Sequence, residues 1–218
     1  KGVLEALLAF PLVALVVRVL RHPDMTIGEL LFDNSVTLAL IAAADEITRQ
    51  AQAHLMDTDA IKAGIDKTVH PLVSMIWQLS NRCAGDAGRY VHWGATTQDV
   101  MDTAIVLQLR DAIALFETTL DDLCATMTTL ARTYRDTPIA GRTHGQQALP
   151  TTFGAKVAVW LAELRRGRER LAQAKPRILV GQFGGAVGTL AGLGESVVDA
   201  LAVQAALMDE LGLAAPPI

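Results

Sequence analysis

The longest helical pattern in this chain reads DTAIVLQLRDAIALFETTLDDLCATMTTLARTY and runs from Asp102 to Tyr134. Apolar residues recur within it at steps of three or four, which is the spacing of one helix face. At 1.5 Å per residue such a helix would be about 50 Å long, and helices of that length are typical of extended bundles. It should end before Pro138, because proline cannot continue the backbone hydrogen-bond ladder. The apolar positions are Ile105, Leu109, Ala112, Phe116, Leu120, Leu123, Met127 and Leu130.

Two more helices are predicted after this one. The first should begin at Pro150, since proline suits a first helical position, and run to about Ala174, before Pro176. The second is predicted from Glu195 to Leu211. The first 90 residues also have helical patterns, so we expect an all-α fold.

The composition agrees with this fold class and excludes several functions. Of 218 residues, 51% are hydrophobic and only 5% aromatic, which favours packed helices over a disordered chain or a β-sandwich. Lys and Arg number 19 against 23 Asp and Glu, with no basic block, so we expect no nucleic-acid partner. Cys83 and Cys124 lie far apart without a CxxC motif, which argues against disulfides and a zinc site and favours a reducing cytoplasm.

One apolar segment, Val3 to Leu20, has two interpretations. It could be a membrane span or the core of a signal peptide. It is interrupted by Glu5, Pro11 and Arg18, and charges and a central proline weaken a span. We therefore expect a buried helix here and no association with a membrane.

A first polar loop, VHWGATTQDVMDTA, precedes the long helix and covers residues 91–104. Backbone N–H groups at a helix start are unpaired and carry the positive end of the helix dipole, so a loop rich in hydroxyls and amides can hold a carboxylate there. The alternative is ordinary capping by Thr97 or Asp99, which the spacing alone favours. The candidate side chains are His92, Thr96, Thr97, Gln98 and Asp99.

A second polar loop, GRTHGQQALPTTFG, covers residues 141–154. Arg142 could bind a carboxylate through two hydrogen bonds, and the near-neutral pKa of a histidine suits His144 for proton transfer. In the alternative interpretation, His144 only satisfies a buried backbone carbonyl. Further hydroxyl and amide groups come from Thr143, Gln146 and Gln147.

Two other segments have weaker signals. His70, in KTVHPLV, lies near an apolar run, where a lone histidine is usually structural. The glycine-rich GQFGGAVGTLAGLG, residues 181–194, contains neither GxGxxG nor GxxxxGK[ST], so it is not a nucleotide loop. Its glycines indicate a tight, mobile loop or a close approach of backbones.

Three segments, HWGATTQD, GRTHGQQALPTTFG and GQFGGAVGT, occur in this order with long helices between them. Together they resemble the fumarase/aspartase superfamily, over about residues 67–218, and most of all the branch of adenylosuccinate lyase and 3-carboxy-cis,cis-muconate cycloisomerase. The resemblance implies a helical N-terminal domain at residues 1–90 and a central helix-bundle domain, incomplete here, at 91–218. It also implies a homotetramer whose active sites take segments from different subunits.

The resemblance further implies a reaction and its residues. The reaction is reversible elimination or addition next to a carboxylate, on a small polycarboxylate substrate, in the cytoplasm and without metal or organic cofactor. His144 matches a general acid and His70 a second active-site histidine. The predicted substrate-binding residues are His92, Thr96, Thr97, Gln98, Arg142, Thr143 and Gln146.

The particular activity follows from departures within the branch. In adenylosuccinate lyases the histidine that aligns with His70 tends to stand between arginine and aspartate, whereas here Val69 and Pro71 flank it. GQQALPTTFG and QFGGAVGTLAGLGE look more like the cycloisomerases, although many of those lack a histidine at the position of His144. We therefore expect an activity most like 3-carboxy-cis,cis-muconate cycloisomerase. The alternatives are an adenylosuccinate lyase that releases fumarate, and a non-catalytic structural member of the fold.

One expected motif is not in the chain. The superfamily's signature loop, which resembles GSSxMPxKxNP and carries the serine thought to abstract the proton, does not occur in these 218 residues. We therefore expect the chain to be part of a longer protein, with the general base beyond residue 218.

Overall fold

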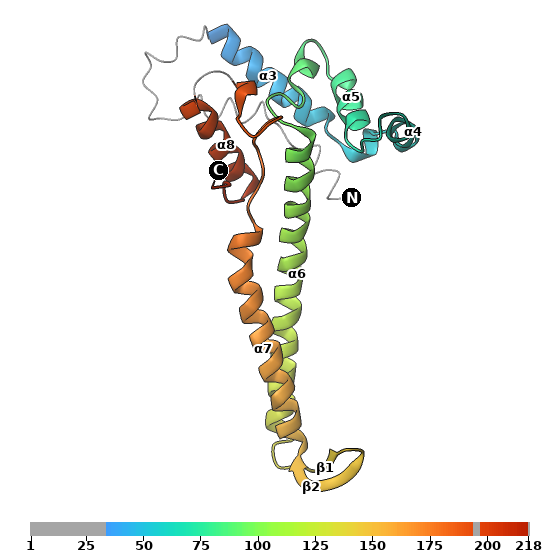
Figure 1. Ribbon diagram of the computed structural model, residues 1–218, viewed down its shortest axis with the longest axis vertical. Helices are drawn as coiled ribbons and strands as arrows, with labels where there is room; N and C mark the ends of the chain where they lie inside the picture. The colour runs from blue at the N-terminus through green and yellow to red at the C-terminus, as the bar shows by residue number, and fades with distance from the viewer. Residues whose placement is uncertain (1–33, 194–196, 218) are drawn as a thin grey trace. The chain divides into compact units, whose positions relative to one another are not determined.

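The computed structural model describes residues 34–193 and 197–217 (Figure 1). The described residues are mostly helical, which confirms the all-α prediction. The apolar segment Val3 to Leu20 lies outside them. Of the helices in the described part, none is both long and apolar enough to cross a membrane.

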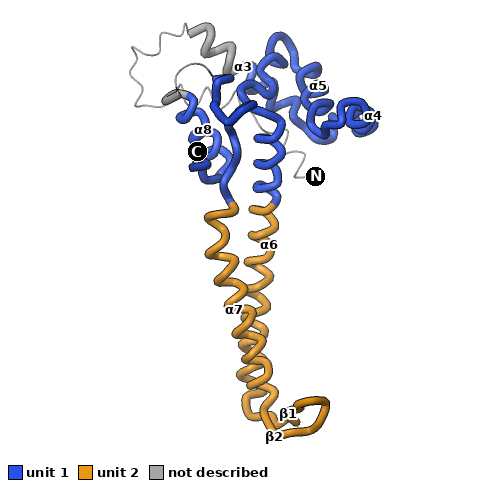
Figure 2. Tube along the Cα trace, in the orientation of Figure 1, with its two compact units in different colours: residues 1–108, 179–218 blue, residues 109–178 orange. Residues whose placement is uncertain are grey.

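The chain forms two compact units (Figure 2). Unit 1 holds the described residues up to Gln108 and from Leu179 onward, and unit 2 holds Leu109–Ile178. The domain boundary expected between residues 90 and 91 stays a prediction. The elements of unit 1 are α3 (Asn34–Gln50), η1 (Ala53–Leu55), α4 (Thr58–Thr68), α5 (Val73–Arg82), η2 (Ala87–Tyr90), the first turns of α6 (Thr97–Thr133), η3 (Ala191–Leu193) and α8 (Val197–Leu211). Unit 2 contains the rest of α6, β1 (Pro138–Thr143), β2 (Gln146–Thr152) and α7 (Phe153–Ile178).

Unit 1 has two buried clusters that share α6. In the first, Ile47 of α3 and Met75 of α5 pack with Val100 at the start of α6. In the second, Phe183 is fully buried between Leu107 of α6 and Leu207 of α8. The N-terminal end of α6 is therefore held from both sides, which gives the loop before it a rigid base.

In unit 2, α6 and α7 run side by side and antiparallel (Figure 1). Lys175 Nζ lies 2.7 Å from Glu117 Oε2, and Arg168 forms an ion pair with Asp121. The helix predicted over 102–134 is confirmed, since α6 contains all its apolar positions. Much of that apolar surface is exposed in the single chain; Phe116, for example, is 60% exposed.

The start and end predicted for the second long helix are wrong. Pro150 lies in β2, paired with Ala140, and α7 begins only at Phe153. A two-stranded ribbon tolerates this proline because each strand is an edge, where a missing N–H costs little. At the other end α7 continues through Pro176 to Ile178, since a proline in the last turn removes only one hydrogen bond. The third predicted helix is confirmed as α8.

The β1–β2 hairpin is a second feature that helical periodicity did not predict. Its strands pair from Pro138 and Thr152 to Thr143 and Gln146, with an irregularity between Ala140 and Arg142. Gly141 lies at this irregularity, where a Cβ would be 2.6 Å from the Leu149 carbonyl oxygen. The bulged register therefore requires glycine.

Candidate active site

His70 and Thr97 form the first part of the candidate site. α4 ends at Val69, whose φ of 55° lies in the left-handed region and turns the chain into His70. The backbone N–H of Leu72 donates to His70 Nδ1 at 3.2 Å, and His70 Nε2 lies 3.1 Å from Thr97 Oγ1. Because Nδ1 is an acceptor, a neutral His70 carries its proton on Nε2 and donates it to the Thr97 oxygen. The hydroxyl hydrogen of Thr97 is then free to point to a ligand oxygen.

His92 lies in the same unit, and burial disfavours the charged form of its ring. It has a φ of 67°, and burial lowers its pKa below the ordinary value of 6.5, against the opposing effects of a backbone hydrogen bond with Thr96 and the charge of Asp99. Its Nε2 is buried and has no hydrogen-bond partner among the described residues. Buried polar atoms without a partner are rare in folded proteins, and a functional role is one explanation for them.

Asp99 caps the start of α6. Capping by Thr97 or Asp99 was the second of the two interpretations of the first polar loop. The Oδ2 atom of Asp99 accepts a hydrogen bond from the backbone N–H of Thr96 at 2.9 Å. It also accepts from the glycine-rich segment, at 3.1 Å from Gly184 N and 2.9 Å from Gly185 N. The hydroxyl of Thr97 takes no part in this cap and bonds to His70 instead. The negative charge of Asp99 occupies the helix end, so a substrate carboxylate would rely on side-chain donors there.

The side chain of Gln98 bonds along its own helix. It is exposed, and its Nε2 donates to Asp102 Oδ1 one turn along α6 at 2.8 Å. Such a pair at i and i+4 is an ordinary helix-surface interaction.

The second polar loop forms the turn of the hairpin in unit 2. His144 and Gly145 have φ values of 49° and 73°, the signs that a two-residue type I′ turn requires. The His144 side chain is exposed, so it does not satisfy a buried carbonyl. Arg142, Thr143 and Gln146 flank the turn and are also exposed.

The predicted residues thus fall into two groups. Unit 1 brings together His70 and Thr97, with His92 and Thr96 in the adjoining loop. The hairpin of unit 2 carries Arg142, Thr143, His144 and Gln146.

Backbone strain coincides with these segments. Among the described residues, four non-glycine residues have positive φ: Val69, His92, His144 and Leu190. Positive φ is uncommon outside glycine and is a strong outlier for a β-branched residue such as Val69. Two of the four are candidate histidines, Val69 adjoins a third, and Leu190 lies in the glycine-rich segment. Strain of this kind clusters at functional sites.

Asp99 makes contacts that sequence reasoning did not predict. The sequence offered it as a candidate of the first polar loop or as a cap of the helix, but its bonds to Gly184 and Gly185 join residues 85 and 86 positions apart. Among the described residues, no group of three or more His, Cys, Asp or Glu side chains is arranged to hold a metal ion.

Comparison with known proteins assigns the class. The family model described as "Lyase" matches residues 20–217. The chain belongs to this lyase family, within the fumarase/aspartase superfamily.

Individual relatives carry different names. The 3-carboxy-cis,cis-muconate cycloisomerase of Pseudomonas aeruginosa is 46% identical over 177 residues, or 80% of this chain and 38% of that protein. The adenylosuccinate lyase of Methanothermobacter thermautotrophicus is 42% identical over 171 residues, or 78% of this chain and 37% of that protein. The crystal structure of the 3-carboxy-cis,cis-muconate lactonizing enzyme from Pseudomonas putida superposes with a TM-score of 0.83 at 37% identity, over 100% of this chain and 46% of that chain. The chain spans less than half the length of these relatives.

Proposed function

We propose that the whole protein is a cytoplasmic lyase or cycloisomerase that catalyses reversible elimination or addition next to a carboxylate of a small polycarboxylate. Its activity would be most like that of 3-carboxy-cis,cis-muconate cycloisomerase. The observation that carries this proposal is the hydrogen bond from His70 to Thr97, because it leaves the threonine hydroxyl free to donate to a carboxylate at the start of α6.

The chemistry of this reaction explains the choice of donors. When a proton is lost next to a carboxylate, negative charge moves onto the carboxylate oxygens. Hydrogen-bond donors already in position stabilise that charge without reorganisation. Thr97 would act as such a donor, with Thr96 and Gln98 beside it. His92 would contact the substrate through its unpaired Nε2.

The hairpin would supply the acid. An exposed His144 at the turn can approach a substrate from a separate element and protonate the leaving oxygen or nitrogen. Arg142 would bind a second carboxylate through its planar guanidinium, and Thr143 and Gln146 would add neutral contacts. The general base is expected in a part of the protein outside this chain.

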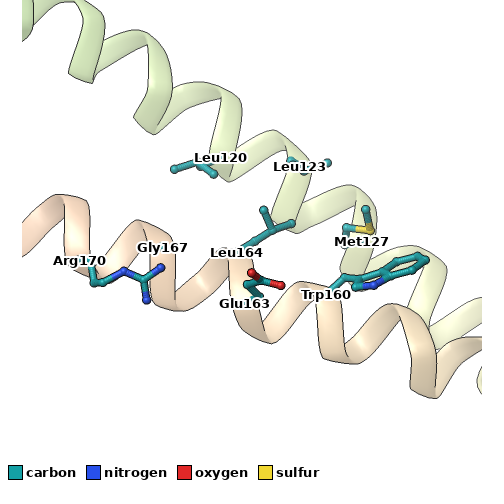
Figure 3. Close-up of a pocket in the computed structure, with 8 residues that line it drawn as sticks. All are labelled: Leu120, Leu123, Met127, Trp160, Glu163, Leu164, Gly167 and Arg170. Carbon is teal, nitrogen blue, oxygen red and sulfur yellow. The ribbon is translucent and has the colours of Figure 1, made fainter. Parts of the chain in front are cut away.

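The assembly that we propose is a homotetramer. In unit 2 a groove of about 410 Å³ lies between α6 and α7, with Leu123 and Met127 on one side and Trp160 and Leu164 on the other (Figure 3). Apolar surface of this extent on an isolated helix pair favours burial against other helices. Neighbouring subunits would cover it and complete the sites.

The competing activity is that of adenylosuccinate lyase, which the relative at 42% identity favours. The test incubates the purified full-length protein with 3-carboxy-cis,cis-muconate and, separately, with adenylosuccinate, and follows ultraviolet absorbance. We expect loss of the diene absorbance of the muconate and no fumarate from adenylosuccinate. Fumarate release would overturn our first choice in favour of the lyase, and inactivity on both would favour a non-catalytic role.

A further inference from the structure

Asp99 is a buried carboxylate held by backbone groups from two distant segments. Only 2% of the surface of this residue is exposed to solvent. Its three hydrogen bonds come from the backbone N–H groups of Thr96, Gly184 and Gly185. Because a buried charge is costly unless it is fully bonded, this arrangement strongly favours one relative position of the two segments.

The same two segments also touch through their backbones. Gly185 has a φ of 75°, and a Cβ there would lie 3.2 Å from the carbonyl oxygen of Gly94. A Cβ at Gly192 would lie 3.1 Å from the Gly94 Cα. The glycine-rich segment therefore packs on the loop that carries His92 and Thr97, with no room for side chains between them.

The glycine-rich segment has its own anchors elsewhere. Thr103 Oγ1 donates to the Gln182 carbonyl at 2.9 Å and accepts from its N–H at 3.0 Å. Gln204 Nε2 donates to the Phe183 carbonyl at 2.7 Å. These bonds hold residues 182–183 but make no contact with the loop before α6. Asp99 is the side chain that links this segment to Thr96.

We propose that Asp99 is a positioning residue, which locks the glycine-rich segment onto the Thr96–Thr97 loop and so presets the contacts for a substrate carboxylate. This inference deepens the proposed function and rests on it. Asp99 itself touches no substrate, since the residue is buried and both its oxygens already accept from backbone N–H groups. Its effect passes through Thr96 and Thr97, which the cap holds in place for both the ground state and the transition state.

Substrate binding should therefore suffer together with chemistry. A contact to the carboxylate that exists in the ground state raises KM when it is lost, and the part that strengthens as negative charge develops lowers kcat. In the full-length protein, Asp99→Asn keeps the shape but turns one acceptor oxygen into an N–H₂ donor that faces a backbone N–H. We expect KM to rise at least about tenfold and kcat to fall as well. A purely structural role would instead lower the amount of active enzyme, with reduced apparent kcat and an unchanged KM.

Thr103→Val is the matched control. Thr103 is fully buried and anchors the same segment, yet it has no bond to the Thr96 loop. Its loss should lower the melting temperature while KM stays within about twofold of wild type. Equal KM increases in both variants would overturn the specific role of Asp99.

A second readout does not depend on turnover. Hydrogen exchange followed by mass spectrometry should show faster exchange in Asp99→Asn both in peptides spanning 92–97 and in peptides spanning 181–190. Thr103→Val should speed exchange only in the second set. If Asp99→Asn leaves residues 92–97 unchanged, the positioning role is wrong. This result stands even if the wild-type protein turns over neither substrate, in which case only the proposed function has failed.

A third variant covers the case in which Asp99→Asn does not fold. Gly185→Ala should push the glycine-rich segment away from the loop before α6. The new Cβ would press on the Gly94 carbonyl oxygen, and alanine disfavours the positive φ at this position. The same joint increase of exchange in 92–97 and 181–190 is expected, and no increase in 92–97 would overturn the proposal.

Discussion

His70 Nε2 lies 3.1 Å from Thr97 Oγ1, although the two residues are 27 positions apart in the chain. The bond joins the turn after α4 to the first residue of α6. It sets the tautomer of the histidine and the direction in which the threonine hydroxyl can donate. A pair of residues with weak individual signals thus becomes a polarised donor at the end of a helix.

Thr97→Val tests this donor. The substitution keeps the β-branched shape and removes the hydroxyl, so a substrate carboxylate loses one charge-assisted hydrogen bond. We expect kcat/KM of the full-length protein to fall by about 10- to 100-fold. The control is Thr119→Val on the same helix, where the exposed hydroxyl bonds only to the Leu115 carbonyl. Equal activity in the two variants would argue against substrate contact at Thr97.

His144→Asn tests the general acid. Asparagine tolerates the left-handed conformation of this turn position, so the hairpin should keep its shape while the proton donor is lost. We expect kcat to fall by at least about 100-fold with little change in melting temperature. Activity near that of wild type would remove His144 from the mechanism.

His92→Gln tests the buried histidine through the pH dependence of stability. Burial lowers the pKa of His92 below 6.5, so the unfolded chain takes up a proton there that the folded chain does not. The free energy of unfolding should therefore decrease as the pH falls below 6.5, and less steeply in His92→Gln. Denaturant titrations from pH 7 to about 5 measure this slope. The range lies above 4.5, the ordinary pKa of a glutamate, so the titration of Glu46 falls below it.

The control for this titration is His54→Gln, since His54 is exposed. Identical slopes in all three proteins would mean that water reaches the His92 ring in the folded state.

Two glycines of α7 give opposite predictions for the same substitution. At Gly154 a Cβ would lie 2.6 Å from both the Ala131 carbonyl oxygen and the Arg135 Cα, and backbone atoms cannot move aside cheaply. Gly154→Ala should therefore destabilise the protein by about 1–3 kcal/mol. At Gly167 the atom nearest to an added Cβ is Arg170 Nη2 at 3.9 Å. Gly167→Ala should therefore raise the free energy of unfolding by about 0.5–1 kcal/mol. Urea unfolding measures both, and a stabilising Gly154→Ala would contradict the close approach of α6 and α7.

The helices could be read from the sequence because their signals are local. The three- and four-residue steps from Ile105 to Leu130 require a helix whatever surrounds it, and α6 contains them all. The hairpin has no such signal, since its strands are largely exposed and show no alternation of apolar and polar residues. The pair His144-Gly145 was the available hint, because a two-residue turn with positive φ favours glycine.

The candidate site was likewise predictable from the sequence only in its local motifs. The motifs around Thr97 and His144 and the glycine-rich motif after them, taken in order, were enough to predict the superfamily, and the comparisons confirm it. They could not reveal that Asp99 holds Gly184 and Gly185, nor that His92 Nε2 is buried without a partner in the described part of the chain.

The sequence alone thus determined the helical class, the long helix and the family, because periodicity and motif order are properties of neighbouring residues. The tertiary structure alone decided which donors bond to the oxygens of Thr97 and Asp99. Thr97 bonds to His70 and Asp99 to the glycine-rich segment because the half-buried ring and the backbone N–H groups, all distant in the sequence, lie next to these oxygens in the fold. These pairings form only when the chain has folded, since burial makes each unpaired polar group costly.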